Sequence, residues 1–294
     1  MKWRVTPTES GSTLLAFLKS KLPEKFSARR LKRALEDNLC QINGRTERFA
    51  SFTVGNGDQI TLLVDELPSP TSKSELFSPE RILYEDDSLL IYNKPVGVVS
   101  DSTELLKAIQ RNLPYLALVH RLDRDTTGVL IFAKTTEMLH AMNALFKERT
   151  IQKSYLAIVD GYPEKPSGII DNQLGILKRY QGQTIWGVVN AKGLPATTEW
   201  QCQKKGHHAS LLNCFPKTGR THQLRVHLSH MGHPILGDHQ YGRLFRCSYR
   251  PNRYLLHAES VSFLHPLTQA PILVTAPIPL DFQQACDQLF GVSR

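Results

Sequence analysis

The chain has 294 residues and a formal net charge of +9, from 36 Lys and Arg against 27 Asp and Glu. Hydrophobic residues make up 41% of it, which is enough for a large core plus a smaller unit and excludes a disordered tail. No stretch approaches the roughly 20 consecutive apolar residues of a membrane-spanning helix, and the basic N-terminus leads into polar residues without an apolar signal segment. We therefore expect a cytoplasmic protein with no membrane partner. Its basic excess favours polyanionic partners.

The five cysteines are scattered along the chain, odd in number and without a C-x-x-C pair. This usage predicts free thiols in a reducing compartment rather than a disulfide framework or a thiolate zinc site. The cysteines are Cys40, Cys202, Cys214, Cys247 and Cys286.

A segment rich in proline and serine divides the sequence. Residues 65–80 contain three prolines and four serines, a composition that suits neither a helix nor a central strand. We interpret this segment as a linker between a small unit over residues 1–64 and a larger unit over residues 81–294.

The small unit begins with two predicted helices. Apolar side chains recur at helical spacing over residues 12–22, and a second helix is predicted to start after Ser27 as its N-cap. The second helix carries four cations on its predicted exposed sides, enough for a phosphate-binding patch. They are Arg29, Arg30, Lys32 and Arg33. Such a cluster is usually a solvated helix face, so the elements around it decide whether it has a function.

Two strands complete the small unit. They are predicted over residues 39–42 and 59–64, with Asn43-Gly44 as a tight turn and Gly57-Asp58 leading into the second strand. With the basic helix, this order favours contact with RNA.

The larger unit is predicted to contain many strands and few helices. Periodicity predicts strands over residues 88–92, 129–133, 151–159, 197–203, 209–215 and 272–275, and helices over residues 136–149, 221–230 and 281–289. The sequence therefore predicts an α+β fold, in which a mixed, mainly antiparallel sheet with peripheral helices follows a small α/β module.

One run of residues stands out chemically. His120-Arg121-Leu122-Asp123-Arg124-Asp125-Thr126-Thr127-Gly128 precedes the apolar stretch 129–133. An acidic residue between arginines, at a turn before a buried strand, suits a carboxylate at the floor of a cleft. We expect Arg121 and Arg124 to favour the ionised form of Asp123. The alternative is a solvated turn with a surface ion pair.

This run resembles the H-R-L-D-x-x-T-S-G signature of RNA pseudouridine synthases of the RluA type, with Thr127 in the usual Ser position. Two further motifs agree. Residues 153–157 resemble K-x-Y-x-A, with Tyr155 as the tyrosine, and residues 219–227 resemble G-R-T-H-Q-x-R-x-H, with Arg225 as the second arginine. Asn93-Lys94-Pro95 is similar to the N-K-P motif that shapes the cleft wall, where Lys94 contacting phosphate is an alternative. The connection 98–118 is shorter than in many members.

The small unit is similar to the RNA-binding module shared with ribosomal protein S-four. This similarity rests on residues 27–30, 42–44 and 57–58. Together the two resemblances cover roughly residues 12–64 and 82–275.

The resemblance implies that the protein isomerises uridine to pseudouridine without metal or cofactor. Asp123 is then the catalytic nucleophile or base, and Tyr155 stacks on the base where the C5 proton leaves. Arg225 pairs with Asp123, since a guanidinium can hold a carboxylate bidentately. Arg121 fills the space left by the flipped uridine, and Arg220 meets phosphate.

The attached module and the His120 form of the motif resemble members that act on large-subunit ribosomal RNA, with transfer RNA as the second candidate substrate. A non-catalytic RNA-binding or ribosome-assembly protein stays open, although it would not require Asp123, Tyr155 and Arg225 in their motifs. A metal hydrolase also stays open, because five histidines crowd a short segment without an H-E-x-x-H motif. They are His222, His227, His230, His233 and His239. No motif predicts an obligate protein partner, the target uridines or the oligomeric state.

Overall fold

The computed structural model describes residues 1–22, 26–36, 39–63, 77–110, 113–180, 183–242 and 244–291. The chain divides into two compact units, one of Met1–Thr71 with Lys178–Ile185 and one of Ser72–Leu177 with Trp186–Arg294. Most of the predicted linker, up to residue 76, lies outside the described residues. Within the described ranges, no helix has the length and apolar character needed to cross a membrane.

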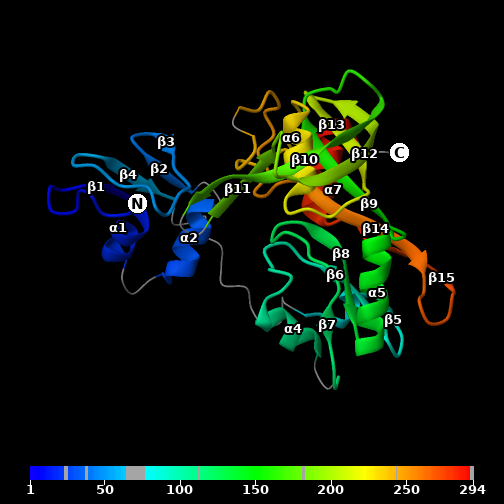
Figure 1. Cartoon of the computed structure of the whole chain (residues 1–294). Coiled ribbons are helices and arrows are strands. Elements are labelled where there is room, and N and C mark those ends of the chain that lie inside the picture. Colours follow the sequence, from blue (N-terminus) through cyan, green and yellow to red (C-terminus); the bar gives the residue numbers. More distant parts are fainter. Residues whose placement is uncertain are drawn as a thin grey trace. The chain divides into compact units, whose positions relative to one another are not determined.

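The smaller unit packs two helices with a four-stranded antiparallel sheet in the order β1-β4-β2-β3 (Figure 1). Its elements are β1 (Lys2–Arg4), α1 (Leu14–Lys21), α2 (Ala28–Glu36), β2 (Cys40–Ile42), β3 (Arg45–Thr46) and β4 (Gln59–Leu62). Both predicted helices and both predicted strands are present. The strands β1 and β3 were not predicted, because three and two residues are too few to show an alternating pattern.

Helix α2 begins after Ser27 as predicted, whereas α1 begins at Leu14, two residues after the predicted start. The Thr13 hydroxyl accepts a hydrogen bond from the amide of Ala16, and the Ser27 hydroxyl accepts one from the amide of Arg30, each at 3.2 Å. On α2, Leu31 and Leu35 are fully buried in the core of the unit. These side chains form the inner face of α2.

The Asn43-Gly44 turn and the Gly57-Asp58 strand entry stabilise each other. Asn43 lies in the left-handed region with φ 51°, and its side-chain amide donates to the Asp58 carboxylate at 2.8 Å. The side-chain Oδ1 of Asn43 accepts a hydrogen bond from the backbone amide of Gln59 at 2.8 Å. The Asp58 carboxylate accepts one from the backbone amide of Gly55 at 2.7 Å. Two motifs that are 15 residues apart thus form one polar junction between β2 and β4.

The second sheet has the order β11-β10-β12-β13-β9-β14-β8-β6-β5, with β15 beside β14 and β7 beside β8 (Figure 1). It belongs to the larger unit except for the end of β10 and the start of β11, which fall in the smaller unit. The strands are β5 (Ile82–Glu85), β6 (Leu89–Lys94), β7 (Ala117–Leu118), β8 (Thr127–Ala133), β9 (Gln152–Asp160), β10 (Ser167–Tyr180), β11 (Gln183–Val188), β12 (Leu194–Gly206), β13 (Ala209–Pro216), β14 (Leu256–Leu264) and β15 (Pro271–Thr275). The helical segments are η1 (Pro79–Arg81), α4 (Thr103–Gln110), α5 (Thr136–Glu148), α6 (Gln223–His230) and α7 (Leu280–Phe290).

The predicted fold class is confirmed, because the registers of the described strands are antiparallel apart from the pairing of β14 with β8. On α5, Met138 and Met142 are fully buried, and Leu145 and Phe146 are half-buried against the same core. Helix α4 lies within the connection 98–118, where the sequence predicted no element. Its eight residues give only two buried apolar positions, Leu105 and Ile109.

The parallel pairing of β14 with β8 requires a glycine. Gly128 has φ +108° and faces Ala258 across the pair. A Cβ atom on Gly128 would lie 2.1 Å from the Ala258 carbonyl oxygen, a backbone atom that cannot move away without breaking the sheet. Only glycine therefore allows β8 to start directly after the Asp123 loop.

We predict that Gly128→Ala prevents folding or lowers the thermal midpoint strongly, because steric overlap and a positive φ act together. Gly219→Ala is the matched control, since a Cβ on Gly219 would meet no atom within 4 Å. The yield of folded protein and thermal unfolding by circular dichroism would compare the two. Equal midpoints would contradict the assigned role of Gly128.

Candidate active site around Asp123

Asp123 lies in the loop between β7 and β8, with 27% of its side chain exposed. Its carbonyl accepts from the amide of Thr126 at 3.1 Å, which closes the turn. The neighbouring arginines pair elsewhere: Arg121 with Asp101 at 3.3 Å and Arg124 with Asp125 at 2.9 Å. Each of these two arginines therefore forms an ion pair with a carboxylate other than Asp123.

The cation that meets Asp123 is Arg225, in the first turn of α6. Its Nη1 lies 3.4 Å from Asp123 Oδ2, and 7% of its side chain is exposed. The bidentate pair expected with Asp123 is formed with Asp238 instead, at 2.6 Å from Nε and 3.0 Å from Nη2. Nη2 also donates to Gln240 at 2.9 Å. One edge of the guanidinium is thus fixed, and Nη1 points toward Asp123.

Two tyrosine rings lie against the same guanidinium. Its carbon is 4.3 Å from the ring centroid of Tyr254 and 4.9 Å from that of Tyr241. Burial disfavours the charge on Arg225, but Asp238, Tyr254 and Asp123 together raise the pKa of the guanidinium above its ordinary value. Arg225 is therefore a permanent buried cation beside Asp123.

His222 is a second polar group near Asp123. It precedes α6 with φ 57°, its Nδ1 lies 2.6 Å from the Tyr241 hydroxyl, and its Nε2 lies 3.9 Å from Asp123 Oδ2. Burial, with a smaller contribution from Arg225, lowers the pKa of His222 to about 4. At neutral pH the imidazole therefore shapes the surroundings of Asp123 as a neutral group.

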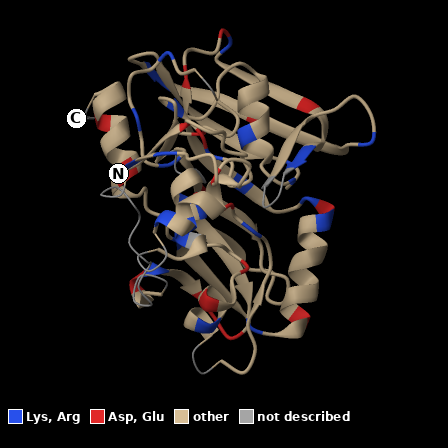
Figure 2. Ribbon diagram, turned by 90° about the vertical axis from the view of Figure 1, so that its left-hand side faces the viewer, with Lys and Arg blue, Asp and Glu red and all other residues tan. Residues whose placement is uncertain are grey.

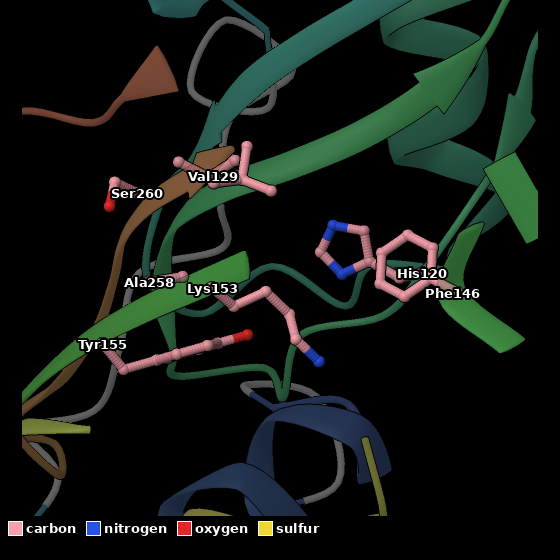
Figure 3. A pocket seen from close by; sticks show the side chains of 8 residues that line it. His120, Val129, Phe146, Lys153, Tyr155, Ala258 and Ser260 are labelled. Atoms are coloured by element: carbon pink, nitrogen blue, oxygen red, sulfur yellow. The ribbon is translucent and has the colours of Figure 1, made fainter. Parts of the chain in front are cut away.

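Tyr155 projects from β9 into a small pocket beside this site. The pocket is lined by His120, Val129, Phe146, Lys153, Tyr155, Ala258, Ser260 and Val261 (Figure 3). Burial, and then the charge of Asp123, raise the pKa of the Tyr155 phenol above its ordinary value. Its hydroxyl is therefore uncharged at neutral pH. The influence of Asp123 on this pKa relates the pocket electrostatically to the carboxylate.

Two buried cations hold the backbone that follows Asp123. Lys94 has no exposed surface and donates to the carbonyls of Pro95, Val98 and Arg124 at 2.8–2.9 Å. The alternative that Lys94 contacts phosphate is wrong for this reason.

Arg253 forms a bidentate pair with Asp281 at 2.6 and 3.1 Å, and its Nη1 donates to the Asp125 carbonyl at 3.1 Å. Successive carbonyls of the Asp123 loop are thus bound by different cations.

The predicted RNA-binding residues are distributed over both units. In the larger unit Arg121 is exposed, whereas Arg220 is half-buried and its Nε donates to the Pro195 carbonyl at 3.0 Å. Figure 2 shows Lys and Arg positions spread over strands, helices and loops, with Asp and Glu positions among them.

On α2 of the smaller unit, Lys32 is exposed, whereas Arg30 and Arg33 are half-buried rather than on the open face that was predicted. The Arg30 guanidinium lies 4.6 Å from the ring centroid of Phe26, which explains its partial burial. The side chain of Arg29 lies outside the described part of the chain.

The clustered histidines serve as hydrogen-bonding groups. His227 contacts the Thr198 hydroxyl at 2.9 Å and the Asn172 side chain at 3.1 Å, and His233 contacts the Asp160 carbonyl at 2.8 Å. Among the described residues, no group of three or more His, Cys, Asp or Glu side chains is arranged to hold a metal ion.

Comparison with known proteins agrees with this geometry. Residues 88–230 match the model of the RNA pseudouridylate synthase family. The chain is 39% identical over 217 residues to ribosomal large subunit pseudouridine synthase C of Buchnera aphidicola (strain APS), which covers 69% of the chain and 68% of the relative. It is 31% identical, over an alignment of 308 positions, to the Escherichia coli (strain K12) protein of the same name. This alignment covers 97% of the chain and 95% of the relative.

Solved structures give the same result. Human RNA pseudouridylate synthase domain containing 4 superimposes with a TM-score of 0.59 and 27% identity, covering 71% of this chain and 94% of that one. Human RNA pseudouridylate synthase domain containing 1 has a TM-score of 0.58 and 30% identity, covering 67% and 82%. The chain belongs to the RNA pseudouridylate synthase family, and it is an isomerase that acts on uridine in RNA.

The hydroxyl of Thr127 has a defined partner. It lies 2.9 Å from His257 Nδ1, and His257 Nε2 lies 3.3 Å from the Ala276 carbonyl. A carbonyl only accepts, so Nε2 carries the proton and Nδ1 accepts from Thr127. Burial lowers the pKa of His257 to about 4, which keeps this neutral arrangement.

We predict that Thr127→Val lowers the free energy of unfolding by about 1–3 kcal/mol, because it leaves the buried His257 Nδ1 without a donor. Thr127→Ser, which keeps the hydroxyl, should lose less, and chemical denaturation measures both. If the valine variant proved as stable as the serine variant, this hydrogen bond would not stabilise the loop.

Proposed function

We propose that this chain converts specific uridines of large-subunit ribosomal RNA to pseudouridine in the cytoplasm. The observation that carries the proposal is the approach of the Asp123 carboxylate to the fixed Arg225 guanidinium, at 3.4 Å. The relatives named for the ribosomal large subunit support the choice of RNA. Transfer RNA is the alternative substrate.

Access to the uridine requires base flipping. A uridine stacked within folded RNA cannot reach a partly buried carboxylate, so it must swing out and leave a gap. In this proposal Arg121 fills the gap. Arg121 lies two residues before Asp123, which supports this role. Its side chain is long and 66% exposed, so it can leave its ion pair with Asp101 and enter the gap.

The reaction then exchanges one bond at the ribose for another. The bond between N1 and C1′ breaks, the uracil turns, a bond forms between C5 and C1′, and the C5 proton leaves while N1 gains one. Asp123 either attacks the ribose or removes a ribose proton. Either role needs an ionised carboxylate held in one rotamer, which the contact with Arg225 Nη1 supports.

Tyr155 is proposed to form the wall against which the freed uracil turns. Its aromatic face suits stacking on a base, and the pocket beside it limits escape. Because the pKa of its phenol is raised, the hydroxyl meets the base near C5 as a neutral group rather than as a phenolate.

RNA affinity is proposed to come from both parts of the chain. Residues 1–64 serve as the RNA-binding module through the basic side of α2, residues 65–80 as linker, and residues 81–294 as the catalytic domain. Exposed Lys32 and the neighbouring arginines of α2 supply salt-sensitive affinity, and Arg220 lies beside the site to meet phosphate.

Tritium release tests this proposal. Large-subunit ribosomal RNA and transfer RNA transcripts, each carrying C5-tritiated uridine, are incubated separately with the wild-type protein and with Asp123→Asn. We expect the wild type to release tritium from the ribosomal transcript. We expect Asp123→Asn to release none while it still binds RNA, because the amide neither attacks nor accepts a proton as the carboxylate does.

Tritium release from the transfer RNA transcript alone would identify transfer RNA, and not ribosomal RNA, as the substrate. Equal release by the two proteins would contradict the assignment of Asp123. Binding without release from either RNA would favour the non-catalytic alternative.

A further inference from the structure

Lys153 occupies a position in the pocket that the roles above do not use. It lies two residues before Tyr155 on β9, so both side chains project from the same face of the sheet. Figure 3 shows the two side chains extending from β9 into the pocket, with their polar ends beside each other. The ammonium group therefore lies where a substrate held against Tyr155 would pass.

The contacts of Lys153 within the protein are few. Its Nζ donates to the Thr218 carbonyl at the long distance of 3.4 Å and lies 5.7 Å from the ring centroid of Phe146. Among the described residues, no carboxylate lies within ion-pair distance of it. Lys94 is the contrast, because its three donors reach three carbonyls at 2.8–2.9 Å.

The other titratable groups that line the pocket do not compensate this charge. Burial lowers the pKa of Lys153 to about 8. Burial also lowers the pKa of His120 to about 3, with a smaller contribution from Lys153, so that the imidazole is neutral and accepts from the amide of Ile131 at 3.2 Å. Tyr155 is uncharged because its pKa is raised by burial and by Asp123. A half-buried ammonium without an anion is costly, and sites that keep one commonly receive the anion from a ligand.

We propose that Lys153 binds a backbone phosphate of the RNA next to the flipped uridine. The inference rests on the proposed function, because the flipped base is proposed to lie against Tyr155, beside Lys153. A compact ammonium suits a single charged oxygen better than the flat edge of a base. When the phosphate arrives, it supplies the counterion that the protein does not provide, and it places the ribose between Lys153 and Asp123.

The salt dependence of RNA binding tests the proposal. Affinity for the ribosomal transcript is measured over a series of salt concentrations in the Asp123→Asn background, which binds without turnover. Each lost phosphate contact reduces the slope of log affinity against log salt by about one. We expect Lys153→Met to reduce the slope by about this amount. Lys134→Met is the matched control, since Lys134 is satisfied by Glu85 at 2.9 Å, and its slope should stay unchanged.

The pH dependence gives a second readout. The protonated form of Lys153 binds phosphate, so affinity should fall as the pH rises through about 8 in the Lys153 protein and stay level in Lys153→Arg. His120 and Tyr155 do not titrate in this range. Circular dichroism confirms that each variant is folded.

An unchanged salt slope for Lys153→Met would overturn the phosphate assignment. If Lys153→Met in the chain that keeps Asp123 then lost tritium release, the lysine would contact the base instead. The proposed function is tested independently, because it fails if the wild type releases no tritium. A reduced salt slope for Lys153→Met would still locate the phosphate contact in that case.

Discussion

The site depends on one buried guanidinium. Arg225 is charged and almost fully enclosed, and such a group is tolerated only when every donor is satisfied and a counter-charge lies close. Asp238 supplies that charge with 1% of its side chain exposed, and two tyrosine rings cover the guanidinium. Of the two N–H donors that remain, both on Nη1, one meets Asp123. These contacts join α6, the loop after it, Tyr254 two positions before β14, and the Asp123 loop, so a change in any of them is expected to move the carboxylate.

The Asp123 loop is also fixed from its backbone side. Lys94 binds the carbonyl of Arg124, and Arg253 binds the carbonyl of Asp125. Directly after these residues, Gly128 lets β8 approach β14 closely. The carboxylate thus stands at the end of a short backbone segment whose polar groups are satisfied in the interior. This rigidity explains how a loop residue keeps a defined position without a helix or strand of its own, as catalysis requires.

The sequence predicted the residues of the site better than their contacts. Motif resemblance identified Asp123 and Arg225, which are 102 positions apart, and apolar spacing predicted the helices of both units. The sequence alone did not show that Arg124 forms its ion pair with Asp125, the residue that follows it. Asp238 was not predicted, because nothing in the sequence around it marks it as the main partner of Arg225. The strands β10 and β11 were missed because their pairing partners, not their own pattern, define them.

The central claim is that the geometry of Arg225, and not its charge alone, prepares Asp123. Single-turnover tritium release by Arg225→Lys tests it most directly, with RNA affinity measured in parallel. Lysine keeps the charge but cannot bind Asp238 bidentately and reach Asp123 at the same time. We predict a rate lower by about 100-fold, as expected for a misplaced catalytic group, with affinity unchanged. A rate within a few-fold of the wild type would contradict the account, because charge alone would then suffice.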